Sequence, residues 1–216
     1  MKETKSTSAE GLRVYQLNIA LEEIPVWRRV LVREDINLGL LHAVIQVVMG
    51  WTNSHLHQFI IEDMFYLNPR MGKDITFTDI PYIDERKTLL MDVVTRAGSE
   101  FEYEYDFGNS WMHSIFVEDI FTPEKANKHF AECIGGEKAS PPEDCCGPWE
   151  YEEFLDILQD PGHEEYENIM ESLGGNFDPE VFDIKRANTY LHKLKWPRVT
   201  DLQLSRVLMA RDGYEG

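Results

Sequence analysis

The segment 101–118 constrains the fold more than any other part of the chain. Its first half alternates strictly, with aromatic residues at odd positions and acidic residues between them. A period of two residues is typical of a β-strand with one buried face. Gly108-Asn109-Ser110 then favours a tight turn, because Gly and Asn accept the backbone angles that hairpin turns require. The segment therefore predicts an antiparallel hairpin with arms at 101–107 and 111–118.

The N-terminal part of the chain predicts more strands and a first helix. Residues 12–21 alternate like the hairpin, and the short turn that follows favours a second hairpin. Asn37 is a suitable N-cap for a helix, and Gly50 is a suitable stop. Residues 122–147 are rich in Gly, Pro and charge and predict a structured loop. The other predicted elements are strands at 12–21, 26–33 and 56–65 and helices at 37–49 and from Glu85 to Arg96.

The C-terminal part predicts helices. Apolar residues recur at helical spacing after Pro148, before Gly174 and after Asp183. Strands and helices that are followed by helices alone are typical of an α+β fold, here with a mixed, mainly antiparallel sheet. We expect a loose tail at 1–10, a single domain at 11–195 and a C-terminal extension at 196–216.

The charge of the chain argues against direct binding to DNA. Acidic residues number 39 and basic residues 21, so the net charge is −18 at pH 7. Nucleic-acid binding needs a cationic surface, since contacts with phosphates supply most of the affinity. A local basic patch around Arg28, Arg29 and Arg33 remains open. The chain has no export signal and no apolar run of about 18 residues, so we expect a cytoplasmic protein that does not contact membranes.

Short motifs of rare residues recur in a fixed order along the chain. They include Ile24-Pro25-Val26-Trp27, Leu41-His42, Met49-Gly50-Trp51, His55-Leu56-His57, Tyr105-Asp106-Phe107-Gly108, Cys133-Ile134-Gly135-Gly136 and Pro141-Pro142-Glu143-Asp144-Cys145. Together they resemble the plasmid pRiA4b ORF-3-like family, whose members are also described as insertion-element passenger proteins of the TnpR type. The resemblance covers roughly residues 12–192. The chain departs from the family pattern at Cys146, where the family commonly has Gly.

The resemblance implies a compact α+β fold and no established activity. The opening strand–strand–helix–strand order also resembles the start of a ubiquitin-like fold. The TnpR label suggests a resolvase, but the sequence shows neither a nucleophilic Ser with a nearby series of Arg residues nor a basic C-terminal helix-turn-helix. A role as an accessory protein in DNA transposition or recombination therefore rests on the label alone.

Seven residues form a candidate cleft between the hairpin, the 55–57 segment and the loop at 133–147. His113 follows Trp111 on an apolar face, and Asp106 could hold it as an acid–base pair or as a satisfied core pair. His55 and His57 fall on one face of a predicted strand. The acidic residues after Pro142 could bind a cation or cap the next helix. The set is His55, His57, Asp106, Trp111, His113, Glu143 and Asp144.

The cysteines offer a second kind of site. Cys133, Cys145, Cys146 and His163 are the groups best suited to bind zinc. Their spacing lacks a Cys-x-x-Cys knuckle, so we expect packed free thiols and no cofactor. These features favour a domain that binds an unidentified protein or small-molecule ligand in the cleft. A metal-dependent hydrolase or nuclease that uses the same groups is the alternative.

Overall fold

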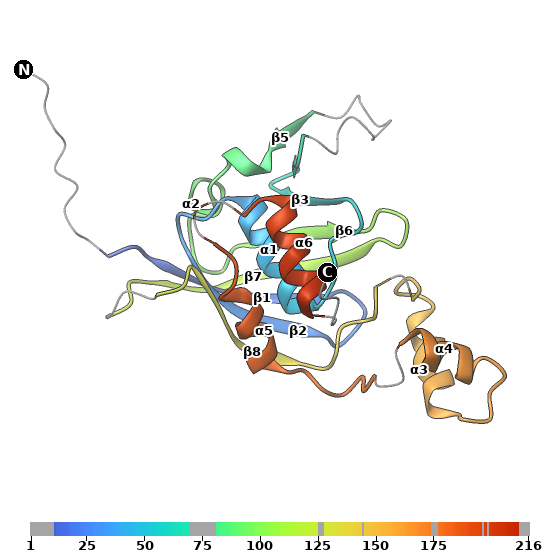
Figure 1. The fold of residues 1–216 in the computed structure, drawn as a ribbon. Coiled ribbons are helices and arrows are strands. Elements are labelled where there is room, and N and C mark those ends of the chain that lie inside the picture. The colour runs from blue at the N-terminus through green and yellow to red at the C-terminus, as the bar shows by residue number, and fades with distance from the viewer. Residues whose placement is uncertain are drawn as a thin grey trace, which may run out of the picture.

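The protein has the predicted α+β fold (Figure 1). The computed structural model describes residues 11–69, 81–124, 128–143, 145–173, 177–195, 197 and 199–211. Within these residues, eight strands form one sheet in the order β5-β4-β3-β6-β7-β1-β2-β8. Neighbouring strands run antiparallel except for β4 and β5, which are parallel. The sheet is therefore mixed and mainly antiparallel, and the first four elements are strand, strand, helix and strand.

The bounds of the elements are as follows. The strands are β1 (Val14–Leu21), β2 (Trp27–Arg33), β3 (His57–Ile61), β4 (Met64–Leu67), β5 (Tyr82–Asp84), β6 (Glu100–Tyr105), β7 (Trp111–Phe121) and β8 (Ala131–Glu137). The helices are α1 (Leu38–Met49), α2 (Leu90–Val93), α3 (Tyr151–Gln159), α4 (Tyr166–Ser172), α5 (Ile184–Leu191) and α6 (Asp201–Arg211), with a 3-10 turn, η2, at Glu85–Lys87. In the described part of the chain, every helix is too short or too polar to cross a membrane.

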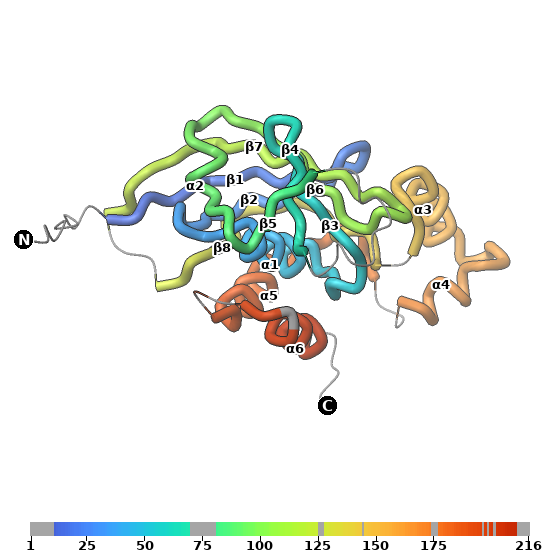
Figure 2. Tube along the Cα trace, turned by 90° about the horizontal axis from the view of Figure 1, so that it is seen from above, coloured from blue at the N-terminus to red at the C-terminus, as the bar shows by residue number. Residues whose placement is uncertain are grey.

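Helix α1 is the centre of the molecule. Every one of its residues except Gly39 is buried, because the helix lies between the sheet and the layer formed by α5 and α6 (Figure 2). A helix that is apolar on all sides is stable only when it is surrounded in this way. The predicted ends are confirmed: the Asn37 side chain accepts from Leu40 N, and Gly50 closes the helix with a φ of 86°.

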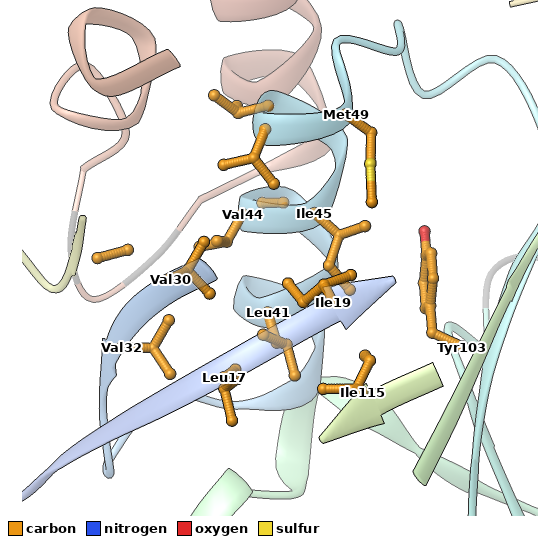
Figure 3. Packing of buried hydrophobic residues seen from close by; sticks show 14 of the residues in the cluster. Leu17, Ile19, Val30, Val32, Leu41, Val44, Ile45, Met49, Tyr103 and Ile115 are labelled. Atoms are coloured by element: carbon orange, nitrogen blue, oxygen red, sulfur yellow. The ribbon is translucent and has the colours of Figure 1, made fainter. Parts of the chain in front are cut away.

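The core packs α1 onto the inner face of the sheet. Leu17 and Ile19 of β1, and Val30 of β2, lie against Leu41 and Ile45 of the helix (Figure 3). All five side chains are fully buried. Burial of each such side chain stabilises the fold by roughly 1.5–3 kcal/mol, so the contact between the sheet and α1 contributes several kcal/mol.

The open face of the sheet is polar. Glu118 on β7 accepts hydrogen bonds from Gln16 Nε2 at 2.6 Å, from Asn18 Nδ2 at 3.4 Å and from both Nε and Nη2 of Arg29 at 2.6 Å. Arg33 is likewise paired with Asp35. Two of the three arginines that left a basic patch open are therefore neutralised by carboxylates. The third, Arg28, points to the opposite face and is buried.

The segment 131–137 forms β8, although the sequence predicted a loop there. Cys133 faces Val30 of β2, and Gly135 and Gly136 face Arg29 and Arg28. The two glycines obscured the strand because Gly is rare in strand interiors. Gly136 is needed for a close approach: a Cβ built there would lie 2.5 Å from the Phe182 ring and 3.0 Å from Arg28 Cδ.

The single helix predicted from Glu85 to Arg96 is also wrong. The segment contains η2 and the four-residue helix α2. Leu89 forms a β-bridge with Asn37, and Leu90 N donates to Ile36 O. These bonds to the start of α1 draw the chain out of a continuous helix. Helix α6 lies in the range predicted as a C-terminal extension, and its Leu204 and Leu208 are buried in the core.

Gly136→Ala is expected to lower the free energy of unfolding by roughly 1–3 kcal/mol, because the added methyl group overpacks the contact with Phe182. Gly135→Ala is the matched control. A Cβ built at Gly135 would lie 3.4 Å from its nearest atom outside the two flanking residues, which belongs to the Trp27 side chain. Urea denaturation of both variants measures the difference. Equal stabilities for the two variants would contradict the close-approach explanation.

Candidate functional site

The predicted hairpin is confirmed, and its register fixes the direction of each side chain. Tyr103 faces His113, and Tyr105 faces Trp111, across β6 and β7. Asp106 follows the last paired residue and has a φ of 60°. Its carboxylate accepts from Gly108 N at 3.1 Å and from Asn109 Nδ2 at 2.8 Å. Asp106 therefore shapes the turn and does not face the second arm.

The predicted pairing of Asp106 with His113 is wrong. His113 is fully buried, and its Nδ1–H lies near two carbonyl oxygens, 3.0 Å from that of Trp111 and 3.2 Å from that of Tyr103. Within the described residues, Nε2 of His113 has no hydrogen-bond partner. Burial lowers the pKa of His113 to about 4. The ring contacts Trp51 edge-on, with 5.3 Å between the centroids, so His113 is a neutral core residue.

Asp106 lies instead beside His55 on the wall of a small pocket. His55 Nδ1 is 3.6 Å from Asp106 Oδ1, and the two side chains are 28% and 10% exposed. The pocket has a volume of about 380 Å³ and is lined by residues 53–56 and 106–108. Asn53, on the same wall, also has a positive φ, of 62°. The pocket therefore combines polar and apolar side chains, and two of its residues have left-handed backbone angles, which Asn and Asp tolerate.

Glu143 connects residues 139–143, here called the 139–143 loop, to the residues that follow α1 through hydrogen bonds. Its carboxylate accepts from the hydroxyl of Tyr105, from the hydroxyl of Thr52 and, at 2.6 Å, from Thr52 N. Burial and the hydrogen bond to Glu143 raise the pKa of Tyr105 well above its usual value. Trp51 Nε1 donates to Pro141 O at 2.9 Å and holds the same loop. Asp144, the neighbouring candidate, lies outside the described residues.

His57 belongs to a buried cluster under the small pocket. It is the first residue of β3, whereas His55 precedes the strand, so the predicted shared face does not form. His57 Nε2 donates to Glu85 at 2.9 Å, and its ring stacks on His42 at 3.5 Å. His42 accepts from the Tyr103 hydroxyl at 2.8 Å and donates to Asn53 Oδ1 at 2.8 Å. Burial lowers the pKa of His42 to about 3.

The sequence analysis missed two members of this cluster. His42 was visible in the Leu41-His42 motif, but its neighbours make α1 look entirely apolar. Glu85 was predicted only as the first residue of a helix, yet it is 1% exposed. Trp111 was named as a cleft residue and is instead buried between Trp51 and Tyr151, with ring centroids 6.1 and 6.4 Å away. Of the seven cleft residues, His55 and Asp106 line the small pocket, and Glu143 lies at the 139–143 loop.

The four predicted zinc ligands lie in different settings. Cys133 is buried in β8 and donates to Gly135 O at 3.3 Å. Cys145 and Cys146 are half-buried, with 3.1 Å between their sulfur atoms, and this contact raises the pKa of Cys145 and lowers that of Cys146. His163 is exposed and accepts from Glu165 N. In the described ranges, no three His, Cys, Asp or Glu side chains are placed to hold one metal ion; the expectation of free thiols without a cofactor stays a prediction.

A second, larger cavity lies beside the 139–143 loop, and its wall shares no residue with the small pocket. Its volume is about 940 Å³, and its wall comes from residues 47–52, 139–143, 171–173 and 177–190, with Arg28. The wall combines apolar side chains, including Val47, Phe177 and Phe182, with charged ones, including Asp178 and Arg186. Glu143 lines this cavity and touches the residues that lead into the small pocket. Sequence reasoning did not find this cavity, because its walls come from segments far apart in the chain.

Arg28 ties together the segments that build this cavity. It is 1% exposed and donates to Val48 O, Trp27 O, Glu137 O and Ser140 Oγ at 2.7–2.9 Å. Its guanidinium stacks on Phe182, 3.8 Å from the ring centroid. Among the described residues, no carboxylate forms an ion pair with it. Burial lowers its pKa to about 10, so it stays charged at neutral pH.

Comparisons with known proteins give a consistent result. The family described as plasmid pRiA4b ORF-3-like protein matches residues 13–186. The uncharacterized protein y4hQ of Sinorhizobium fredii strain NGR234 is 37% identical over 192 residues, which are 86% of this chain and 95% of the relative. The crystal structure of MM3350, a protein of unknown function from Methanosarcina mazei Go1, has a TM-score of 0.70 and 37% identity, over 81% of this chain and 97% of that one.

Proposed function

Since this chain belongs to the plasmid pRiA4b ORF-3-like family, whose matched relatives are described as uncharacterised or of unknown function, we propose a function from the geometry of its cavities. The protein is a binding domain that holds a small organic ligand in the larger cavity beside the 139–143 loop. The ligand has an apolar body and a polar group at one end.

The composition of the cavity wall carries this proposal. Ligand sites are typically concave, about 300–1,000 Å³ in volume, mainly apolar, and equipped with a few converging polar groups. The larger cavity, at about 940 Å³, falls within this range of volume. The end of α1 and Phe177 supply apolar surface to its wall, and Thr52 and Glu143, which are hydrogen-bonded to each other, supply a polar group. The apolar body of the ligand would lie on the former, and its polar group would reach the latter.

The support beneath the cavity also suits a binding site. Side chains in such a site must be held by their own hydrogen bonds and packing, so that binding does not have to order them. Glu143 is held by Thr52 and Tyr105, and Arg28 fixes the end of α1 through Val48 O. The wall is therefore arranged before a ligand arrives, which lowers the entropic cost of binding.

The probe for this proposal is 1-aminoanthracene, a dye with an apolar body and an amine at one end that can donate a hydrogen bond to the Glu143 carboxylate. We expect one dye molecule to bind per folded chain, with amide shifts confined to residues that line the cavity. Ala187→Phe should weaken binding at least about tenfold, since each 1.4 kcal/mol of lost contact is a factor of ten. Ala187 is buried on α5 and lines the cavity, so the larger side chain takes up part of the cavity volume.

Leu202→Phe is the matched control, because Leu202 is 61% exposed on α6 and does not line the cavity. Both variants should keep the far- and near-ultraviolet circular dichroism of the parent, which separates specific binding from binding to a molten state. Unchanged dye affinity in a folded Ala187→Phe protein would refute the proposal. So would amide shifts that map to the open polar face of the sheet.

A further inference from the structure

Cys145 and Cys146 form an unusual pair on the segment that leads into α3. Their sulfur atoms are 3.1 Å apart and share a hydrogen bond. Both side chains are half-buried and pack against the edge of the core, so they keep partial access to solvent. Neither residue lines the larger cavity, so the pair is separate from the site of the proposed function.

A disulfide between these two residues would be strained. Adjacent Cα atoms are about 3.8 Å apart across a trans peptide, whereas disulfides normally join Cα atoms about 4.4–6.8 Å apart. Cys133 offers no alternative partner in the folded protein, because it is 1% exposed within β8 and its thiol donates to Gly135 O. The two neighbouring thiols therefore stay available together as a pair of sulfur ligands.

The separation of the sulfur atoms selects the kind of atom that can bridge them. With metal–sulfur bonds of about 2.3 Å, as in zinc thiolates, a separation of 3.1 Å gives a bond angle of about 85° at the bridging atom. That angle is far below the tetrahedral angle that zinc prefers. It suits a pyramidal centre whose bonds lie near right angles. We propose that Cys145 and Cys146 form a two-sulfur site for a soft, thiophilic element of the trivalent arsenic class.

The binding step requires no oxidant. With an aryl arsenoxide, each thiol forms one arsenic–sulfur bond, and the arsenic–oxygen double bond is broken. The two thiol protons leave with the oxygen as one molecule of water, and arsenic remains trivalent. The second bond forms within the same molecule, so a pair of ligands can exceed the affinity of one by a factor of about 10²–10⁴.

Phenylarsine oxide is the probe for this site. We expect one adduct per folded chain by native mass spectrometry, and the adduct should protect Cys145 and Cys146 from a thiol reagent that labels them in the free folded protein. Cys146→Gly and Cys145→Ser should each weaken binding at least about 100-fold, because only one bond to arsenic remains. Cys146 is only half-buried, so the fold should tolerate Cys146→Gly. Cys133→Ser is the matched control and should bind as the parent does.

Three results would overturn the assignment. Affinity of Cys146→Gly within about threefold of the parent would show that the second thiol takes no part, since a chelate loses at least about 100-fold. Loss of the adduct in a folded Cys133→Ser protein would place the site elsewhere. Tighter binding of zinc than of the arsenical, measured by competition on the folded parent, would show that the pair adopts tetrahedral geometry.

Discussion

Arg28→Ala is expected to lower the free energy of unfolding by at least about 3 kcal/mol, because each buried acceptor left without a donor costs roughly 1–3 kcal/mol. Arg28 donates to three backbone carbonyls and to Ser140, and its guanidinium stacks on the ring of Phe182. Removal of the side chain frees the end of α1, the end of β8 and the start of the 139–143 loop at once. Equilibrium unfolding in urea measures the loss.

Arg29→Ala is the matched control for this prediction. Arg29 is the next residue on β2, but its side chain is 34% exposed and pairs with Glu118 on the open face. Partly exposed ion pairs contribute about 0–1 kcal/mol, so the loss should stay within that range. Arg28→Lys keeps the charge but loses the planar group of N–H donors. Its loss of unfolding free energy should therefore be similar to that of Arg28→Ala. Losses within about 1 kcal/mol of each other for Arg28→Ala and Arg29→Ala would refute the role of Arg28.

The free energy of unfolding is expected to fall by about 4 kcal/mol between pH 7 and pH 5 through His42 and His113 together, at about 2 kcal/mol each. Burial lowers their pKa values to about 3 and about 4 in the folded protein. In the unfolded chain both return to about 6.5. Between these limits the unfolded chain binds more protons, so stability decreases as the pH falls. Above about pH 7.5 these two groups contribute almost nothing.

His113→Leu isolates one half of this effect. The variant should be less stable than the parent at pH 7, but its loss of stability between pH 7 and pH 5 should be smaller by about 2 kcal/mol. Urea denaturation at both pH values gives the two differences, and the comparison cancels the contributions of all other titrating groups. Equal pH dependence in parent and variant would show that His113 takes up a proton in the folded protein.

The elements that could be predicted are those whose sequence pattern lies within a few neighbouring residues. The alternation at 101–107 was sufficient for β6, and Asn37 and Gly50 were sufficient for the ends of α1. β8 escaped prediction because Gly136 makes no side-chain pattern. The need for glycine at position 136 comes from Phe182, which lies 46 positions later in the chain and whose ring leaves no room for a side chain there.

The candidate site was predicted less well, because its contacts join distant segments. The chain showed that His55, Asp106 and Glu143 are unusual, but not that Glu143 would bond to Thr52 and Tyr105. The pairing of Asp106 with His113 was wrong because the register of the hairpin ends before Asp106. Arg28 was the most informative error: strand alternation puts it on the same face as Val30 and Val32, and that pattern alone indicated a buried cation.

The position of β1 affects how the chain reaches its native state. β1 lies between β2, which follows it at once, and β7, so that Leu17 has a neighbour at Val117. Contacts between such distant residues form slowly, since a long loop must close before they contribute. During synthesis the β1–β2 hairpin emerges first and exposes both of its edges until β7 and β8 have left the ribosome. Unpaired edges of this kind attract other chains, so the interval before β7 and β8 appear is when aggregation competes with folding.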